Sequence, residues 1–226
     1  MNRPLQAIKG IGPKKAELFA RLGIATCGDL LRHFPRDYLD FSHMVPVKAA
    51  QGVCAVRVRL CSTPKVARLG RGRTIVNLRA EDDSGPIGVV WFNQPYVAQR
   101  LAEGKTYCLC GRVERSEKGG ARMINPMIAA GDAPPGILPV YSLCAGLSQN
   151  ALRTAVQAAL TSSDFGEDLF PAGLRERMGL PSGREAFFAL HCPQSEAQLR
   201  AARRRFALED IVSYLLGMRL IAGGKE

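Results

Sequence analysis

The chain has 226 residues and a formal net charge of +11, from 31 Lys and Arg against 20 Asp and Glu. Its hydrophobic content of 46% excludes a disordered chain and is enough for one large domain or two small ones. No apolar run approaches the roughly 20 residues that span a bilayer, and the start lacks the apolar core of a signal peptide, so we expect no membrane association and a cytoplasmic location. The basic charge favours a polyanionic partner, because cationic side chains release counterions from phosphates.

The cysteines and histidines predict neither a disulfide framework nor a metal site. The seven cysteines are an odd number, and none are paired as C-x-x-C. We interpret them as reduced core thiols. The three histidines are scattered, so a metal site would need unrelated segments to converge.

Residues 1–50 are expected to form a small helical unit. A short turn of helix precedes Gly10-Ile11-Gly12, Pro13 opens a second helix, and Thr26 caps a third. This pattern resembles a helix-hairpin-helix unit, in which backbone N–H groups of the hairpin face a phosphate. The candidate phosphate contacts are Gly10, Gly12, Lys14 and Lys15. A glycine turn that merely links two packed helices stays an open alternative.

Residues 51–132 change to an alternating period. Five strands are expected, with a helix at Pro95–Ala102 between the third and the fourth: Val53–Cys61, Arg73–Ala80, Ile87–Phe92, Lys105–Val113 and Ala121–Ile128. This element order is that of a five-stranded OB-fold β-barrel. The fold class is therefore α+β, with the barrel between a helical unit at 1–50 and a helical region at 133–226.

The third strand leads into an aromatic corner. Val89, Val90 and Trp91 have strand character, Asn93 can cap a helix, and Pro95 suits its first turn. Strand alternation favours Trp91 inside the barrel, although Phe92 as the inward residue remains an alternative. Phe92 and Tyr96 would then flank the corner and could stack on nucleic-acid bases.

Basic residues flank the face on which OB-folds bind nucleic acid. That face lies over strands 2 and 3, between the loops joining strands 1 to 2 and 4 to 5, here residues 64–72 and 114–120. We expect phosphate contacts from the basic residues in and beside these loops: Lys65, Arg68, Arg71, Arg73, Arg115, Lys118 and Arg122. Solvated loop arginines are the alternative.

Charge is concentrated away from the C-terminal region. Residues 1–50 carry 8 basic and 4 acidic side chains, residues 51–132 carry 13 and 7, and residues 133–226 carry 10 and 9. After a Pro- and Gly-rich linker at 131–136, Ser148 caps a helix, and a long periodic segment runs from Glu196 to Ile221. These helices are expected to serve packing, with the Arg203-Arg204-Arg205 run as a solvated face. Phosphate contact by this run is the alternative.

No catalytic machinery is indicated. Gly104-Lys105-Thr106 resembles the end of a phosphate-binding loop, but the first glycine of that motif is missing and Lys105 enters a strand. Glu81, Asp82 and Asp83 are interpreted as turn residues. We expect no catalytic residue, no metal and no cofactor in this chain.

The ordered set of motifs resembles one family. GIGPKKAELFARLGI, DLLRHFPRDYLDFS, WFNQPY within the barrel, LPVYSLCAGLSQNALR and RRRFALEDIVSYLLGMRL follow one another as in the N-terminal region of the RecG family of ATP-dependent DNA helicases. The resemblance implies that the barrel is a wedge domain that splits branched DNA at stalled replication forks and Holliday junctions, for fork regression or branch migration in repair and recombination. The wedge aromatics would be Phe92 and Tyr96.

The resemblance also implies parts that this sequence does not contain. The helicase motor domains, which bind ATP and Mg²⁺, are missing after Glu226. The chain is therefore expected to act as a monomeric wedge in the bacterial cytosol or nucleoid, without ATPase activity of its own, and its last helices would pack on the motor domains. A general single-stranded DNA or RNA-binding barrel without fork preference, or a module that docks protein, is the alternative.

Overall fold

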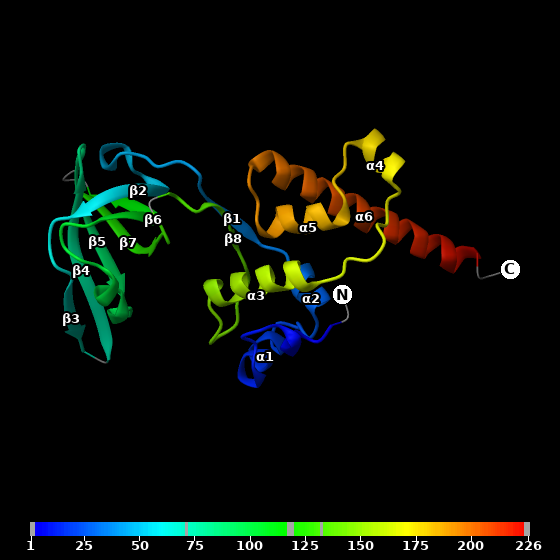
Figure 1. Ribbon diagram of the computed structural model, residues 1–226, viewed down its shortest axis with the longest axis horizontal. Coiled ribbons are helices and arrows are strands. Elements are labelled where there is room, and N and C mark those ends of the chain that lie inside the picture. Colours follow the sequence, from blue (N-terminus) through cyan, green and yellow to red (C-terminus); the bar gives the residue numbers. More distant parts are fainter. Residues whose placement is uncertain (1–2, 71, 117–119, 132, 224–226) are drawn as a thin grey trace. The chain divides into compact units, whose positions relative to one another are not determined.

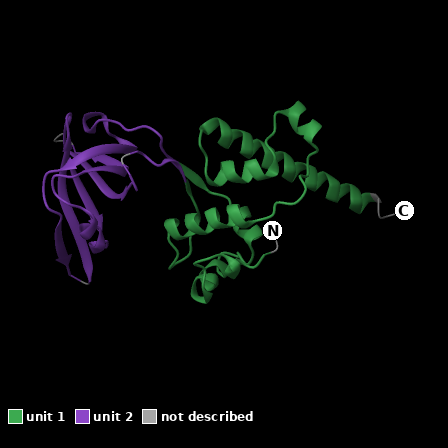
Figure 2. Cartoon of the chain, in the orientation of Figure 1, with its two compact units in different colours: residues 1–38, 139–226 green, residues 39–138 purple. Residues whose placement is uncertain are grey.

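Residues 39–138 fold as one unit, and the segments on either side of them, residues 1–38 and 139–226, fold together as another (Figure 2). The structure is a computed structural model that describes residues 3–70, 72–116, 120–131 and 133–223. We call the helical assembly unit 1 and residues 39–138 unit 2. These boundaries differ from the three segments expected from the sequence, because residues 1–38 share a hydrophobic core with residues beyond 139.

Unit 1 is built from helices, which alternate with short turns (Figure 1). They are η1 (Leu5–Ala7), α1 (Pro13–Ala20), α2 (Cys27–Arg32), α3 (Gln149–Ser162), α4 (Ala172–Met178), α5 (Gly183–His191) and α6 (Glu196–Gly223). Side-chain caps set three helix starts: the hydroxyls of Thr26, Ser148 and Ser182 accept backbone N–H bonds at the starts of α2, α3 and α5. The caps at Thr26 and Ser148 confirm the sequence prediction.

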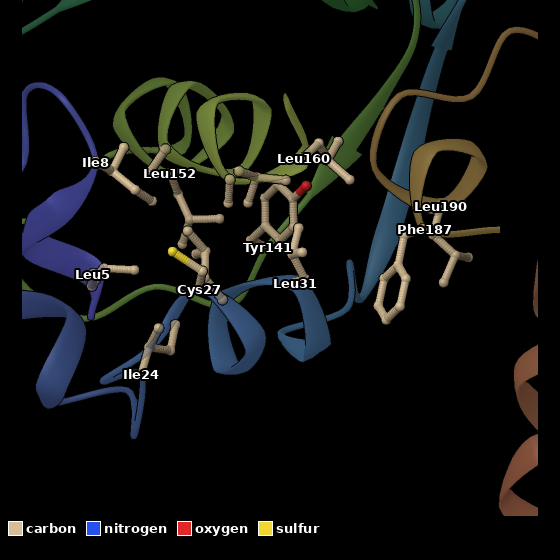
Figure 3. Close-up of a cluster of buried hydrophobic side chains, with 14 of the residues drawn as sticks. Leu5, Ile8, Ile24, Cys27, Leu31, Tyr141, Leu152, Leu160, Phe187 and Leu190 are labelled. Carbon is tan, nitrogen blue, oxygen red and sulfur yellow. The ribbon is translucent and has the colours of Figure 1, made fainter. Parts of the chain in front are cut away.

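The core of unit 1 joins side chains from both ends of the chain. Figure 3 shows Leu5, Ile8 and Cys27 from the N-terminal segment converging on Leu152 and Leu160 of α3. These five side chains are all at most 4% exposed. The N-terminal helices are therefore stabilised by burial against α3 rather than within a unit of their own.

Unit 2 is a closed barrel. Its strands are β2 (Gly52–Leu60), β3 (Lys65–Leu69), β4 (Arg73–Asp82), β5 (Gly85–Phe92), β6 (Thr106–Arg115) and β7 (Ala121–Ile128), in the sheet order β2-β6-β7-β5-β4-β3. Pairing of β2 with β4 closes five of them into a ring, in which β5 and β7 are parallel and the other pairs antiparallel. The predicted OB-fold barrel is confirmed.

Three features of unit 2 differ from the sequence prediction. Residues 65–69, expected in a loop, form β3, which pairs with β4 beyond the barrel. The segment after β5 is a 3₁₀-helix, η3 (Pro95–Arg100). Its N-cap is Gln94, whose side chain makes no capping hydrogen bond, so the predicted cap at Asn93 is wrong. A further 3₁₀-helix, η2 (Val47–Ala49), precedes β2.

Two short strands also went unpredicted. Strands β1 (Asp37–Phe41) and β8 (Gly136–Val140) pair in a two-stranded sheet. The sequence analysis assigned the first to the helical unit and placed a linker up to residue 136. Both strands are only five residues long, so neither offers enough alternation to be recognised.

Candidate nucleic-acid interface

Adjacent residues at the end of β5 face opposite sides of the barrel wall. The Trp91 side chain is 1% exposed and lies in the barrel core, where its indole Nε1 donates a hydrogen bond to the carbonyl oxygen of Pro126 at 2.8 Å. Phe92 is 40% exposed. The expected orientation, with Trp91 inside and Phe92 outside, is confirmed.

The backbone around Phe92 is held from two sides. The backbone N–H of Phe92 donates to Oδ1 of Asn125 at 2.7 Å. Asn93 adopts a left-handed φ of 57° and exchanges two hydrogen bonds with Thr74: its N–H donates to the Thr74 carbonyl at 2.8 Å, and its Oδ1 accepts from the Thr74 N–H at 3.1 Å. Asn93 thus stabilises the corner by joining β4 to the end of β5.

Tyr96 provides the second exposed ring of the corner. It lies on η3 and is 56% exposed, and its hydroxyl donates to Oε1 of Gln94 at 2.9 Å. Nε2 of Gln94 in turn donates to Oδ1 of Asn125 at 3.5 Å. The segments that carry Phe92 and Tyr96 are therefore tied to the same asparagine side chain.

Strand register shows which residues share the outer face with Phe92. Paired residues in adjacent strands lie on the same face of a sheet. Phe92 is paired with Ile75 of β4, and Ile75 with Ala67 of β3. Every second residue of these strands therefore belongs to the face of Phe92, which we call the outer face.

The outer face contains three of the predicted basic residues. Lys65 pairs with Asn77, Arg73 lies two residues before Ile75, and Arg122 pairs with Gly88, four residues before Phe92. Lys65, Arg73 and Arg122 are therefore brought onto one surface with Phe92. Lys65 and Arg73 are exposed.

The structure does not place the other predicted basic residues as free cations on the outer face. Arg68 pairs with Thr74 and lies on the opposite face of β3 from Lys65. Arg115 is not a free loop cation: its guanidinium donates to the backbone carbonyls of Ala50, Val47 and Lys48 at the η2 segment, which fixes it to the protein. Arg71 and Lys118 lie outside the described residues.

The outer face also carries arginines that the sequence analysis did not name as contacts, among them Arg79 and Arg112. Arg79 of β4 pairs with Gly88, and Arg112 of β6 pairs with Ile124 of β7, which itself pairs with Val90. Both arginines are exposed. Alternation along β4 would have found Arg79, since residues 73, 75, 77 and 79 share one face.

The predicted hairpin contacts lie in unit 1 and stay a prediction. Gly10 has φ of 91°, which favours glycine, and Gly12 is the N-cap of α1. Both Lys14 and Lys15 are exposed, and Nζ of Lys15 donates to the Gly10 carbonyl at 3.0 Å, so this lysine also stabilises the turn.

The acidic turn after β4 is structural. Oδ1 of Asp82 accepts hydrogen bonds from the backbone and hydroxyl of Ser84 and from Gly85 N–H, and its Oδ2 accepts from Val47 N–H at 2.8 Å. Burial opposes ionisation, but these bonds outweigh it and hold the pKa of Asp82 below its usual value. No group of three or more potential metal ligands exists among the residues described.

The arginine run of α6 is not a uniformly solvated face. Arg205 is 1% exposed and donates to Oδ1 of Asp168 at 2.7 Å, with Glu209 at 3.5 Å, while Arg203 lies 5.0 Å from the ring centroid of Tyr38. In the parts of the chain that are described, no helix combines the length and the apolar character needed to cross a membrane.

Fold and site together define an OB-type barrel with an exposed aromatic corner, inserted into a helical unit. A family model described as the RecG wedge domain matches residues 4–163. The chain belongs to this family.

Relatives with curated names match along the whole chain. It is 30% identical to the ATP-dependent DNA helicase RecG of Streptococcus pneumoniae, over 98% of this chain and 33% of the relative. It is also 30% identical to the protein of that name from Bacillus subtilis, over 94% of this chain and 31% of the relative. A solved structure of RecG bound to a three-way DNA junction superposes with a TM-score of 0.82 at 25% identity, covering 100% of this chain and 32% of that one. The chain thus spans about a third of the length of these relatives.

Proposed function

We propose that the barrel binds branched DNA and that Phe92 and Tyr96 stack on bases where the strands part. The observation that supports this most is the corner itself: two aromatic rings, 40% and 56% exposed, project from segments held by Asn125. Exposed aromatic rings beside cations are suited to stacking on bases, which contributes about 1–3 kcal/mol per base. The similar structure of RecG bound to a three-way junction supports the same ligand.

We further propose that the chain acts as the wedge of a RecG-type helicase in the bacterial cytosol. Strand separation at stalled forks and Holliday junctions would then serve fork regression and branch migration. The ATP and Mg²⁺ for that work would be bound by the part of the relatives that this chain does not match. The barrel itself contributes shape and backbone recognition, so no sequence preference is expected.

The test is binding to a synthetic three-way junction. Phe92→Ala and Tyr96→Ala are each expected to raise Kd by a factor that corresponds to about 1–3 kcal/mol. Tyr214→Ala is the matched control, because Tyr214 is 67% exposed but lies on α6 in unit 1. If both barrel variants bind like the parent, the stacking proposal is wrong.

A second measurement separates the wedge from a general single-strand binder. The junction competes with a single strand of equal length across a range of salt concentrations, because phosphate contacts weaken with salt for both ligands. Preference for the junction at every salt concentration is expected. Preference for the single strand would contradict the wedge role and favour the general binder.

The end of α6 suggests the contact with the rest of a helicase. Its apolar side chains are 51–77% exposed: Ile211, Tyr214, Leu215, Leu216, Met218, Leu220 and Ile221. We propose that this surface packs on the motor domains. Amide hydrogen exchange of residues 211–221 is expected to slow when the remaining two thirds of the Bacillus subtilis relative is added, and unchanged exchange would contradict the proposal.

A further inference from the structure

Gly88 lies on the outer face between two arginines. Its register partner on β4 is Arg79, and its partner on β7 is Arg122. Neighbouring strands lie about 4.8 Å apart, so the two arginine backbones flank a residue without a side chain. Glu114 of β6, the partner of Arg122, is the acid that continues this row.

The missing side chain coincides with a hollow. An open depression of about 540 Å³ is lined by Gly88 together with Asn77, Val90, Ala121 and Arg122, and Glu114, Arg115, Ser116 and Gly120 also line it. Val90 is 3% exposed although it alternates outward with Phe92, so it forms part of an apolar floor. The depression therefore combines an apolar base and an amide side chain with two arginines and one acid, Glu114, in its lining.

The barrel does not need a glycine at this position. A Cβ built on Gly88 would meet only the Ala121 carbonyl oxygen, at 3.8 Å, which is ordinary van der Waals contact, and the backbone is not left-handed. Glycine weakens the middle of a strand, and it occurs there where a ligand or another backbone approaches closely. The position of Gly88 is consistent with access to the depression.

We propose that the Gly88 depression is a second nucleotide site, which accepts a base of the single strand that leaves the junction, while Arg79 and Arg122 contact its phosphates. This inference rests on the proposed function of the Phe92 corner. Gly88 is four residues from Phe92, about 13 Å along the strand. At about 3.4 Å per stacked nucleotide, the base would lie no more than about four nucleotides from the one on Phe92.

The test measures the affinity of the full chain for junctions whose single-stranded arm is lengthened from zero to eight nucleotides. For the parent, affinity is expected to rise about tenfold once the arm exceeds about four nucleotides, as one more base is bound. Gly88→Val fills the depression with a residue that suits strands, so this rise should disappear while binding of the armless junction stays unchanged. Gly88→Ala should give an intermediate rise.

The proposed phosphate contacts are tested with the double variant Arg79→Gln, Arg122→Gln. This double variant should flatten the dependence of log Kd on log salt by about 1.4 for the long-armed junction, at about 0.7 per phosphate contact on a single strand. Arg200→Gln is the control, because it removes one positive charge from an exposed ion pair with Glu196 in unit 1, outside the barrel. It should leave the slope unchanged.

A further experiment uses only the parent protein and modified DNA, so it does not depend on any variant being stable. Abasic nucleotides three to five positions into the arm should abolish the gain in affinity if a base occupies the depression. A full gain with abasic nucleotides, or with a stably folded Gly88→Val, overturns the second site. Binding of Phe92→Ala to the armless junction tests the proposed function, and the gain in affinity with arm length tests the second site. The proposed function can therefore stand while this inference fails.

Discussion

The indole Nε1 of Trp91 donates to the carbonyl oxygen of Pro126 at 2.8 Å, and this bond joins the end of β5 to an irregular stretch of β7. The register of β6 and β7 shifts between Cys110 and Arg112, and Asn125, just before Pro126, has a left-handed φ of 47°. This bulge turns the Asn125 side chain toward the Phe92 backbone. One irregularity therefore supports both the buried anchor and the exposed ring.

We expect Asn125 to position the aromatic corner without contacting DNA. Asn125→Gly keeps the left-handed backbone but removes the acceptor for Phe92 N–H, so the free energy of unfolding should fall by about 1 kcal/mol and junction affinity should fall severalfold. Asn125→Ala should cost more stability, because alanine disfavours that φ. Denaturant unfolding and junction titration measure the two effects. Junction affinity at the parent value in Asn125→Gly would contradict the positioning role.

Arg115→Met should mainly reduce stability. The guanidinium donates to three carbonyls around η2, and hydrogen bonds from a charged group contribute about 1.5–3 kcal/mol. The free energy of unfolding, measured in urea, should fall by about 1.5–3 kcal/mol, whereas the salt dependence of junction binding should stay close to that of the parent. Arg122→Gln is the comparison, expected to change the salt dependence with little loss of stability. The opposite pattern would show that Arg115 contacts phosphate.

Removing only one partner of the Arg205–Asp168 ion pair is expected to destabilise the fold. Asp168→Asn leaves the guanidinium of Arg205, which is 1% exposed, with the longer contact to Glu209 and the neutral carbonyl oxygen of Pro181, so the free energy of unfolding should fall by about 3 kcal/mol. Adding Arg205→Met removes the unpaired charge and should recover part of the loss. A double-mutant cycle in urea measures the coupling. Simple additivity of the two changes would contradict a direct pair.

Stability should fall in mildly acid solution because of His191. This side chain is 2% exposed, with Nδ1 at 2.9 Å from the Tyr141 hydroxyl and Nε2 at 2.8 Å from the Leu31 carbonyl oxygen. Burial lowers the pKa of His191 from 6.5 to about 4. The unfolded chain therefore binds a proton that the folded chain resists, so the contribution is complete above pH 6.5 and is lost as the pH falls toward 4.

The size of this loss in the free energy of unfolding follows from the two pKa values of His191, 6.5 and about 4. At about 1.4 kcal/mol per unit, the free energy of unfolding should decrease by about 3 kcal/mol between pH 6.5 and 4. Urea unfolding across that range measures it. His191→Gln should be less stable at neutral pH but lack most of this dependence. A parent curve that is flat between pH 6.5 and 4.5 would contradict the buried neutral imidazole.

Alternation predicted the barrel well, because most of its strands have one buried face. Trp91 and Phe92 illustrate this, since a period of two places one ring in the core and the other outside. Strand β3 was not predicted, because all five residues from Lys65 to Leu69 are exposed and the strand has no buried face to give an alternating pattern. It exists through its ladder with β4, which composition does not reveal.

The site residues divide in a similar way. Lys65 and Arg73 lie on the outer face as their positions near strands 1 and 2 suggested. Arg115 could not be judged from its neighbours in sequence, because its partners are carbonyls of Val47, Lys48 and Ala50. Arg112 was missed because its place on the outer face depends on the register with β7, across the Asn125 bulge.

The insertion of residues 39–138 into unit 1 has a consequence for the order of folding. When residue 138 leaves the ribosome, every strand of the barrel has its partner, so unit 2 can fold while the chain is still being made. Residues 1–38 have to wait for α3, because Leu5, Ile8 and Cys27 bury themselves against Leu152 and Leu160. A barrel folded first would hold its two ends close together, which shortens the loop that the N-terminal helices must close and lowers its entropic cost.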